Sequence, residues 1–324
     1  MPSTITHAYF SMDIYERLDK KRKKLLNNYK DQFKAFAQGP DVFFFYRLLY
    51  ISGGKKIRNL GHHMQRQQTG EFFINLIAII KEKKLNDNPE IITFLYGFIA
   101  HYVLDMTIHP FVVYKAGIFK RGQKDTYKYF GRHEQIESYI DCYLIKNREK
   151  VKPANFKTHL FCFKSITISS TLEELINATF AKTFNKKNIG EKYKTSLKHM
   201  KLFYKYFRND RTGIKKMIYT LLQIFPFDVK LSAISYNIKL DNDDYYLNLK
   251  NEKWFHSLNK DDIYNYSFIQ LYSIALSKAL KLITEVNEIL QGKVDDSALK
   301  ELFPNLSYLT GRDCELGNGT YFSF

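Results

Sequence analysis

The chain has 324 residues, of which 45% are hydrophobic and 16% are aromatic. This composition excludes intrinsic disorder and allows a sizeable core, in one large domain or in two. The 50 Lys and Arg against 33 Asp and Glu leave a formal net charge of +17, which suits an anionic partner. Most of the excess is lysine spread along polar helix faces. We therefore interpret it as solvated surface, and the charge alone selects no function.

The cysteines and the apolar segments bear on the compartment. The three cysteines are an odd, sparse set without CxxC spacing, which is typical of a reducing compartment: Cys142, Cys162 and Cys314. The first seven residues have neither a basic start nor an apolar core, so we expect no secretory signal there. The longest apolar segments, 72–80 and 91–104, are too short or too interrupted to span a bilayer. We expect a cytoplasmic, soluble protein with no transmembrane segment.

Helical periodicity dominates the chain. The first expected helix covers residues 11–36 and ends at Gly39-Pro40; an apolar run, 42–51, then ends at Gly53-Gly54, and a third segment covers 57–83 with a break at Gly70. Further helices are expected over residues 133–146, 172–184, 191–207, 211–225 and 265–290. Strand-like alternation is confined to 166–169 and 245–249, and both stretches are short.

One further helix begins at Asn88-Pro89-Glu90, which supplies an N-cap, a first-turn proline and a first-turn acid. We expect Pro110 to end it, because proline cannot donate into the helical ladder. The sequence thus predicts an all-α fold. We divide it into a helical domain over 1–200 that carries the candidate site, a helical extension over 201–292 packed on the same core, and a mostly coil tail over 293–324.

Three side chains that can bind metal recur every four residues in this apolar helix: His101, Asp105 and His109. At about 3.6 residues per turn, positions i, i+4 and i+8 point to one side of a helix. Imidazole and carboxylate are ligands that zinc commonly uses. The alternative is two core histidines and a capping aspartate, and the triplet alone leaves both interpretations open.

Further candidates surround the triplet. Six of the nine histidines precede residue 134. His133 and Glu137 repeat the i, i+4 spacing on another expected helix, and Asp41 follows a Gly-Pro turn from which a carboxylate can point into a cavity. With His7, the set offers enough ligands for one to three zinc ions. Asp105, between two histidines, is placed as a carboxylate that bridges two metals.

These residues resemble the zinc-dependent phospholipase C family, whose relatives include secreted bacterial phospholipases C and, more remotely, the P1-type nucleases. The resemblance covers residues 1–145 and is weaker beyond them. It rests on an early histidine followed in order by Gly39-Pro40-Asp41, the aromatic run 43–46, Gly61, residues 69–73 and 96–102, Asp105, His109-Pro110, His133, Glu137 and Asp141. It implies a multi-helix bundle of the zinc phospholipase C and P1 nuclease type, with a helical C-terminal extension.

The resemblance also implies a ligand set. One zinc site would consist of His109, His133 and Glu137, and Asp105 would bridge two further ions. His101 would join one of those ions, and His7 would join the other together with the N-terminal amine. Pro2 would supply that amine once Met1 is removed.

Two carboxylates have roles outside the ligand set. By the resemblance, Asp41 looks like the general base, or the residue that orients the attacking water. Asp141 lies four residues after Glu137 and so on the same helix face, where it could accept a hydrogen bond from a ligand histidine. The alternative for Asp141 is a surface or capping carboxylate.

One position departs from the family pattern. Relatives usually carry a histidine where this chain has Gln65, which is an unusual zinc ligand. His62 lies at i−3 and would share the face of Gln65 in a helix, so we include it provisionally among the metal ligands.

Three functions follow from these residues. The first is a zinc-dependent phosphoester hydrolase of the phospholipase C type, in which metal-bound hydroxide attacks a phosphodiester of a phospholipid or small phosphoester. Peripheral contact with an anionic membrane would suit its charge. The second is a P1-like nuclease or phosphatase, which the lack of basic and aromatic interleaving near the motifs disfavours. The third is a non-catalytic, metal-stabilised helical protein with a partly degraded site.

Overall fold

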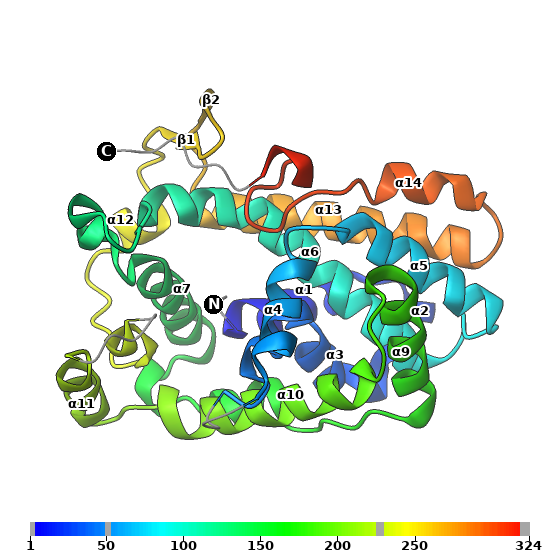
Figure 1. Cartoon of the computed structure of the whole chain (residues 1–324), viewed down its shortest axis with the longest axis horizontal. Helices are drawn as coiled ribbons and strands as arrows, with labels where there is room; N and C mark the ends of the chain where they lie inside the picture. Colours follow the sequence, from blue (N-terminus) through cyan, green and yellow to red (C-terminus); the bar gives the residue numbers. More distant parts are fainter. Residues whose placement is uncertain (1–3, 49–52, 225–229, 318–324) are drawn as a thin grey trace.

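A computed structural model describes residues 4–48, 53–224 and 230–317. Within these residues the chain forms fourteen α-helices and one two-stranded antiparallel sheet, which confirms the all-α prediction (Figure 1). The helices are α1 Thr4–Arg17, α2 Lys20–Leu26, α3 Lys30–Phe36, α4 Lys55–Met64, α5 Thr69–Glu82, α6 Pro89–Ala116, α7 Arg132–Glu149, α8 Thr158–Phe163, α9 Ser170–Phe184, α10 Ile189–Phe203, α11 Ile214–Leu222, α12 Asp243–Leu247, α13 Phe268–Leu290 and α14 Leu299–Leu302. The strands are β1 Trp254–His256 and β2 Asn259–Tyr264.

The long N-terminal helix expected over 11–36 is three helices, α1, α2 and α3. The first break falls at Asp19, whose side chain accepts a hydrogen bond from the backbone N–H of Arg22 and so caps α2 as a new helix. The second is a 3-10 turn, η1, over Asn27–Tyr29. The apolar run that follows is a 3-10 helix, η2, over Gly39–Phe45. Its expected end, at residue 51, lies outside the described residues, as does Phe225 at the expected end of α11.

Helix α6 forms the centre of the molecule. It packs along α13, and α1, α3 and α7 contact its other sides (Figure 1). Phe36 of α3 meets Phe94 of α6 edge to face, with ring centroids 5.5 Å apart. Asn287 of α13 donates a hydrogen bond to the hydroxyl of Tyr96, so the C-terminal helix is tied to the same core. The division into 1–200, 201–292 and 293–324 remains a prediction.

The prediction that Pro110 ends this helix is wrong, because α6 continues to Ala116. Proline in a helix interior costs about 3 kcal/mol, but the next turn buries Phe111 and Val112, each worth about 1.5–3 kcal/mol. The carbonyl of Met106, which would accept from residue 110, faces Gly311 of the C-terminal segment. A Cβ at Gly311 would lie 2.4 Å from that oxygen.

Because α6 continues through Pro110, its apolar segment is longer than the expected 91–104. Among the described helices, α6 is long and apolar enough to cross a membrane, with 28 residues and a mean hydropathy of 1.6 over its most apolar window. However, 89% of that window is buried inside the protein, as in the core helix of a globular fold. Length and composition alone therefore give weak evidence for a membrane span.

The hairpin of β1 and β2 was not expected from the sequence. β2 is mostly exposed, so it lacks the alternation of a half-buried strand. Trp254 of β1 is buried against Phe111 and Tyr264, which agrees with a packing role for this side chain. The segment after α14 contacts α5 and α6. Asn305 accepts a hydrogen bond from the backbone N–H of Thr69 in α5 at 2.7 Å, and the carbonyl oxygen of Tyr308 lies 3.0 Å from Nδ1 of His109 in α6.

Candidate metal centre

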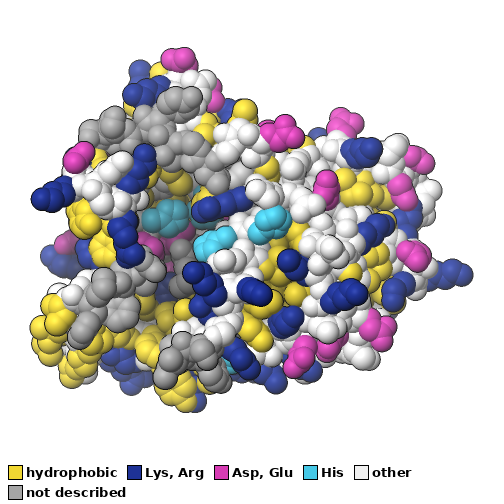
Figure 2. Space-filling view, in the orientation of Figure 1, with side chains coloured by type: hydrophobic (Ala, Val, Ile, Leu, Met, Phe, Trp, Pro, Cys, Tyr) yellow, Lys and Arg dark blue, Asp and Glu magenta, His cyan; other side chains and the backbone are white. Residues whose placement is uncertain are grey.

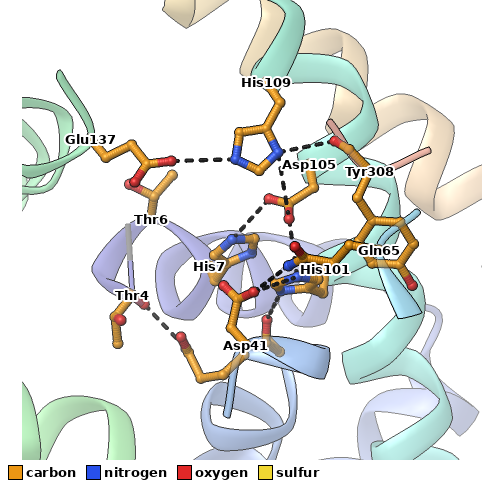
Figure 3. Close-up of polar contacts among 12 residues, drawn as sticks. Thr4, Thr6, His7, Asp41, Gln65, His101, Asp105, His109, Glu137 and Tyr308 are labelled. Carbon is orange, nitrogen blue, oxygen red and sulfur yellow. Dashed lines mark hydrogen bonds and ion pairs between the residues drawn. The ribbon is translucent and has the colours of Figure 1, made fainter. Parts of the chain in front are cut away.

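The triplet on α6 points into the protein. His101, Asp105 and His109 are all buried, and they lie at the junction of α6 with α1, α7 and η2 (Figure 3). Two groups of side chains meet at this junction, and the three ligand atoms of each group lie within 4.8 Å of one another. The spacing of four residues thus places three candidate ligands on one inward face.

The first group consists of His7, His101 and Asp105. The Nε2 atom of His7 lies 3.1 Å from Oδ1 of Asp105, and Nε2 of His101 lies 3.1 Å from Oδ2. The two imidazole rings are stacked, with centroids 4.2 Å apart. His7 and His101 thus face different oxygens of one carboxylate, Asp105, and their assignment to two separate zinc ions stays a prediction.

The second group consists of His109, His133 and Glu137. One oxygen of Glu137, Oε1, lies 3.3 Å from Nε2 of His109 and 2.9 Å from Nε2 of His133. The side chain of His133 is 28% exposed, whereas that of Glu137 is 4% exposed. Asp105 links the groups, since its Oδ2 lies 3.7 Å from Nδ1 of His109.

The geometry of both groups fits zinc. Around a tetrahedral zinc with ligands at about 2.0–2.1 Å, neighbouring ligand atoms lie about 3.3 Å apart. In both groups the carboxylate oxygens lie 2.9–3.3 Å from the imidazole nitrogens, and the three ligand atoms of each group lie within 4.8 Å of one another. Within the described part of the chain, Nε2 of His101 and Oδ2 of Asp105 are buried and not aligned in a hydrogen bond. A cavity of about 20 Å³ lies between the groups, lined by residues that include His7, Asp105, His109 and Glu137, with room for one water-sized atom.

Asp41 and Gln65 lie beside the first group. Gln65 donates a hydrogen bond to Oδ1 of Asp41, and this oxygen is 3.8 Å from Nε2 of His101. The close approach depends on Gly39, which has a φ of +51° and whose Cβ, if present, would lie 2.5 Å from the His101 ring. The Gly-Pro-Asp motif thus brings a buried carboxylate onto the ligand group.

The family model described as zinc dependent phospholipase C matches residues 6–190, which is more than half of the chain. The chain belongs to the zinc-dependent phospholipase C family. No curated protein and no solved structure matches it.

The family match includes all six residues of the two ligand groups. Two of the ligand histidines are oriented by backbone carbonyls. Nδ1 of His101 lies 3.0 Å from the carbonyl oxygen of Ala37, and Nδ1 of His109 lies 3.0 Å from that of Tyr308. A carbonyl acceptor holds the proton on Nδ1 and leaves Nε2 free for a metal. Tyr308 lies outside the family match, and its N–H donates to the carbonyl of Gln65 at 2.9 Å.

The structure does not bring His62 to either group. Its side chain is exposed, and its ring packs against Phe44 with centroids 4.5 Å apart. The position expected to carry a histidine is instead occupied by the buried Gln65. Its amide is held by Asp41, so the provisional role of His62 has no geometric support.

Asp141 is fully buried but contacts α1 rather than a ligand histidine. Its carboxylate accepts hydrogen bonds from the backbone N–H groups of Ile5 and Thr6, and from the hydroxyl of Tyr236. It therefore caps the helix that carries His7, which corresponds to the alternative of a capping carboxylate. Pro2, the expected source of the N-terminal amine, lies outside the described residues.

The pKa values of the two carboxylates in the centre, Asp41 and Asp105, are shifted in opposite directions. Burial raises the pKa of Asp41 to about 7, and the nearby His101 offsets only part of this effect. Burial would also raise the pKa of Asp105, but the surrounding histidines lower it well below its usual range. Burial and the adjacent His101 lower the pKa of His7 to about 4. Ionised Asp105 and neutral His7 are the forms that bind zinc. Burial would also lower the pKa of His109, but the nearby Asp105 and Glu137 outweigh this effect and raise the pKa to about 9.

Proposed function

We propose that this member of the phospholipase C-type family is a zinc-dependent hydrolase of phosphodiesters, acting on a phospholipid or a small phosphoester. The observation that carries the proposal is the pairing of two ligand groups through Asp105, with a further buried carboxylate, Asp41, beside them. The family match supports hydrolase chemistry, and the donor set fits zinc.

The residues divide into two roles. His7, His101 and Asp105 would hold zinc on one side, and His109, His133 and Glu137 on the other. When bound, zinc supplies a Lewis acid that stabilises negative charge on phosphoryl oxygens and makes water more acidic. The carbonyls of Ala37 and Tyr308 would keep the ligand imidazoles oriented.

Asp41 would act on the attacking water. Its Oδ1 is occupied by the amide of Gln65, whereas Oδ2 is buried and has no hydrogen-bond partner among the described residues. A buried acceptor without a donor is costly, which favours a water or substrate proton at that atom. The bond from Gln65 to Oδ1 holds the carboxylate in this orientation, and Oδ2 is left to accept a proton or hydrogen bond from the attacking water.

Access would come from the second group. The exposed fraction of the His133 side chain is 28%, whereas the three residues of the first group are nearly fully buried. A phosphoester would therefore approach past His133, with Asp41 and the first group behind it.

The direct test measures zinc content by mass spectrometry together with hydrolysis of a chromogenic phosphocholine ester. We expect zinc in protein purified without added metal, and hydrolysis that is lost after chelation and restored by zinc. We expect Asp41→Asn to keep its zinc and to lose about 10²–10⁴-fold in rate, the contribution of a general base. The matched control is Asp87→Asn, an exposed carboxylate in the loop before α6.

The outcomes separate the candidate functions. Cleavage of a single-stranded oligonucleotide in preference to the phosphocholine ester would favour a P1-type nuclease. Tightly held zinc without hydrolysis of either substrate would favour a metal-stabilised, non-catalytic protein. An Asp41→Asn variant as active as the parent would remove Asp41 from the mechanism.

We propose a cytoplasmic location as well. It is supported by three free cysteines within the described residues, two of them, Cys142 and Cys162, fully buried. Cell fractionation with an antibody to the chain tests this expectation, and recovery from a secreted fraction would contradict it.

A further inference from the structure

Helix α11 exposes its apolar face. The apolar residues of α11 follow the spacing of one helix face, at i, i+3, i+4, i+7 and i+8: Ile214, Met217, Ile218, Leu221 and Leu222. All five are exposed, with Leu221 at 64% and Met217 at 59%, and no residue of α11 is buried. A surface helix of a globular protein normally turns such a face inward.

The polar side of α11 faces the protein instead. The ammonium group of Lys215 donates to the carbonyls of Tyr206 and Asn209, at 2.6 and 2.7 Å. The hydroxyl of Tyr219 donates to the carbonyl of Phe207 at 2.9 Å. The helix therefore docks through hydrogen bonds, which leaves its apolar residues to the outside.

A buried carboxylate fixes this orientation. Asp210 is 2% exposed, and it accepts from the backbone N–H groups of Lys215 and Lys216 and from the hydroxyl of Ser235. These bonds hold the first turn of α11 on the segment that follows it in the chain. The outward direction of the apolar face is thus built into the fold.

The exposed face is part of a larger patch. Ile224, just beyond α11, is 83% exposed, and Tyr206, which contacts Lys215, is 54% exposed. Hydrophobic side chains gather at the lower left of the molecule, where Figure 1 labels α11 (Figure 2). Contiguous apolar patches of this kind mark sites that bind a partner or a membrane.

The positive charge around the patch favours an anionic lipid surface as its partner. Residues 192–239 contain eleven Lys and Arg but two Asp, and one residue of each sign, Arg208 and Asp210, is buried. An apolar helix face with a basic surround is the composition of helices that lie in the interface of anionic lipids. A second copy of the chain would bring two such basic surfaces together, so self-association is disfavoured by like charge.

The patch is also connected to the candidate metal centre. η6, over Leu231–Ile234, packs against both α11 and α7. The carbonyl of Ala233 accepts from the hydroxyl of Ser138, the neighbour of Glu137, at 2.9 Å. The face shown in Figure 2 carries both the patch and a hollow left of centre, where histidine and acidic side chains are visible.

We propose that α11 is an interfacial anchor, which docks this protein on an anionic lipid surface with the His133 side of the metal centre turned towards the lipid. The five apolar side chains enter the headgroup region, and lysines of 192–239 contact lipid phosphates. The proposed docking depends only on the apolar patch and the charge around it. Its use in presenting a lipid substrate rests on the proposed phospholipase function.

The test is co-sedimentation with phosphatidylglycerol vesicles, compared with phosphatidylcholine vesicles, at low and high salt. The double variant Met217→Ser/Leu221→Ser removes apolar surface from exposed positions only. The matched control is Ile263→Ser/Leu316→Ser, at positions exposed by 53% and 64% outside the patch. Hydrolysis of a soluble phosphocholine ester is measured for each protein.

We expect the parent and the control to bind the anionic vesicles and the α11 variant to bind at least about tenfold more weakly, with unchanged hydrolysis of the soluble ester. Equal binding by the α11 variant, or no binding by the parent, overturns the proposal. So does a parent dimer in light scattering that the α11 variant abolishes. Vesicle binding as expected, with no hydrolysis by any protein, refutes the proposed function and leaves the anchor standing.

Discussion

The two ligand groups differ in how they are enclosed and completed. The residues of the first group come from α1 and α6, and all three are nearly fully buried. The second group joins α6 to α7, and it keeps one partly exposed ligand, His133. The first group is flanked by Asp41 and Gln65, whereas the second is braced by the carbonyl of Tyr308 from the C-terminal segment.

This difference suggests distinct roles: the buried first group would hold metal, and the second group would admit the substrate. A closed group can hold a metal in a dry, fixed environment, but any missing ligand must come from the protein itself. The chain has Gln65 at the position where the resemblance to the family implies an imidazole. Both groups have three candidate ligands, but in the open group one of them, His133, is partly exposed. We therefore expect the second group to bind zinc more tightly and the first to depend on its neighbours.

The largest expected effect is that of Asp105→Asn, which acts on both groups. Asp105 faces His7 and His101 at 3.1 Å and His109 at 3.7 Å, so loss of its charge weakens every contact between the groups. We expect reduced zinc content and at least about a 10²-fold loss of hydrolysis, because metal ions contribute several kcal/mol of charge stabilisation. Zinc analysis and the chromogenic assay measure both. A zinc-loaded Asp105→Asn variant with the parent's rate would contradict the bridging role.

Gln65→His sharpens the contrast by completing the closed group. An imidazole beside Asp41 would replace an amide that is now held by that carboxylate. We expect zinc in the first group to resist removal by a chelator at least about tenfold better, with no change in the second group. Chelator titration monitored by mass spectrometry measures this. Identical zinc loss in the parent and the variant would show that residue 65 does not face the metal.

Asn305→Ala tests the backbone carbonyl that orients His109 in the open group. The side chain of Asn305 accepts from the backbone N–H of Thr69 at 2.7 Å and so anchors the segment that carries Tyr308. Without it, the carbonyl that orients His109 is held less firmly. We expect zinc affinity of the second group to fall by up to about tenfold, the lower end of the effect of such orienting contacts. Asn59→Ala, an exposed residue of α4, is the control. Unchanged affinity would remove Tyr308 from the site.

The smallest expected effect is that of His62→Gln. Because the ring of His62 is exposed and packs against Phe44, we expect unchanged zinc content. The free energy of unfolding should change by less than about 0.5 kcal/mol, as for surface positions. Chelator titration and urea unfolding check the two expectations. A selective loss of zinc from the first group would instead make His62 its missing ligand.

The sequence predicts the site better than its surroundings, for a physical reason. Spacing along a helix determines which side chains share a face, so His101, Asp105 and His109 could be placed together in advance. The carbonyl of Tyr308 could not, because a backbone acceptor has no side-chain signature and lies about 200 residues from His109 in the chain. The periodicity of α11 reveals an apolar face but not its direction, which depends on the hydrogen bonds of Asp210 and Lys215.

Pro110 illustrates the same limit in the fold. Its local preference is to end the helix, and the packing of Phe111 and Val112 against the core overrides that preference. Only the tertiary structure contains the buried area that decides the balance.

The most direct test of the account is the zinc content of protein purified without added metal, measured for the parent and for Glu137→Gln. Glu137 contacts both histidines of the open group, so the variant should lose the tighter of the bound ions. We predict at least one zinc ion per parent chain and a clear reduction in Glu137→Gln. A parent chain that retains no zinc, and takes none up on reconstitution, would contradict the assignment of these residues as a metal centre.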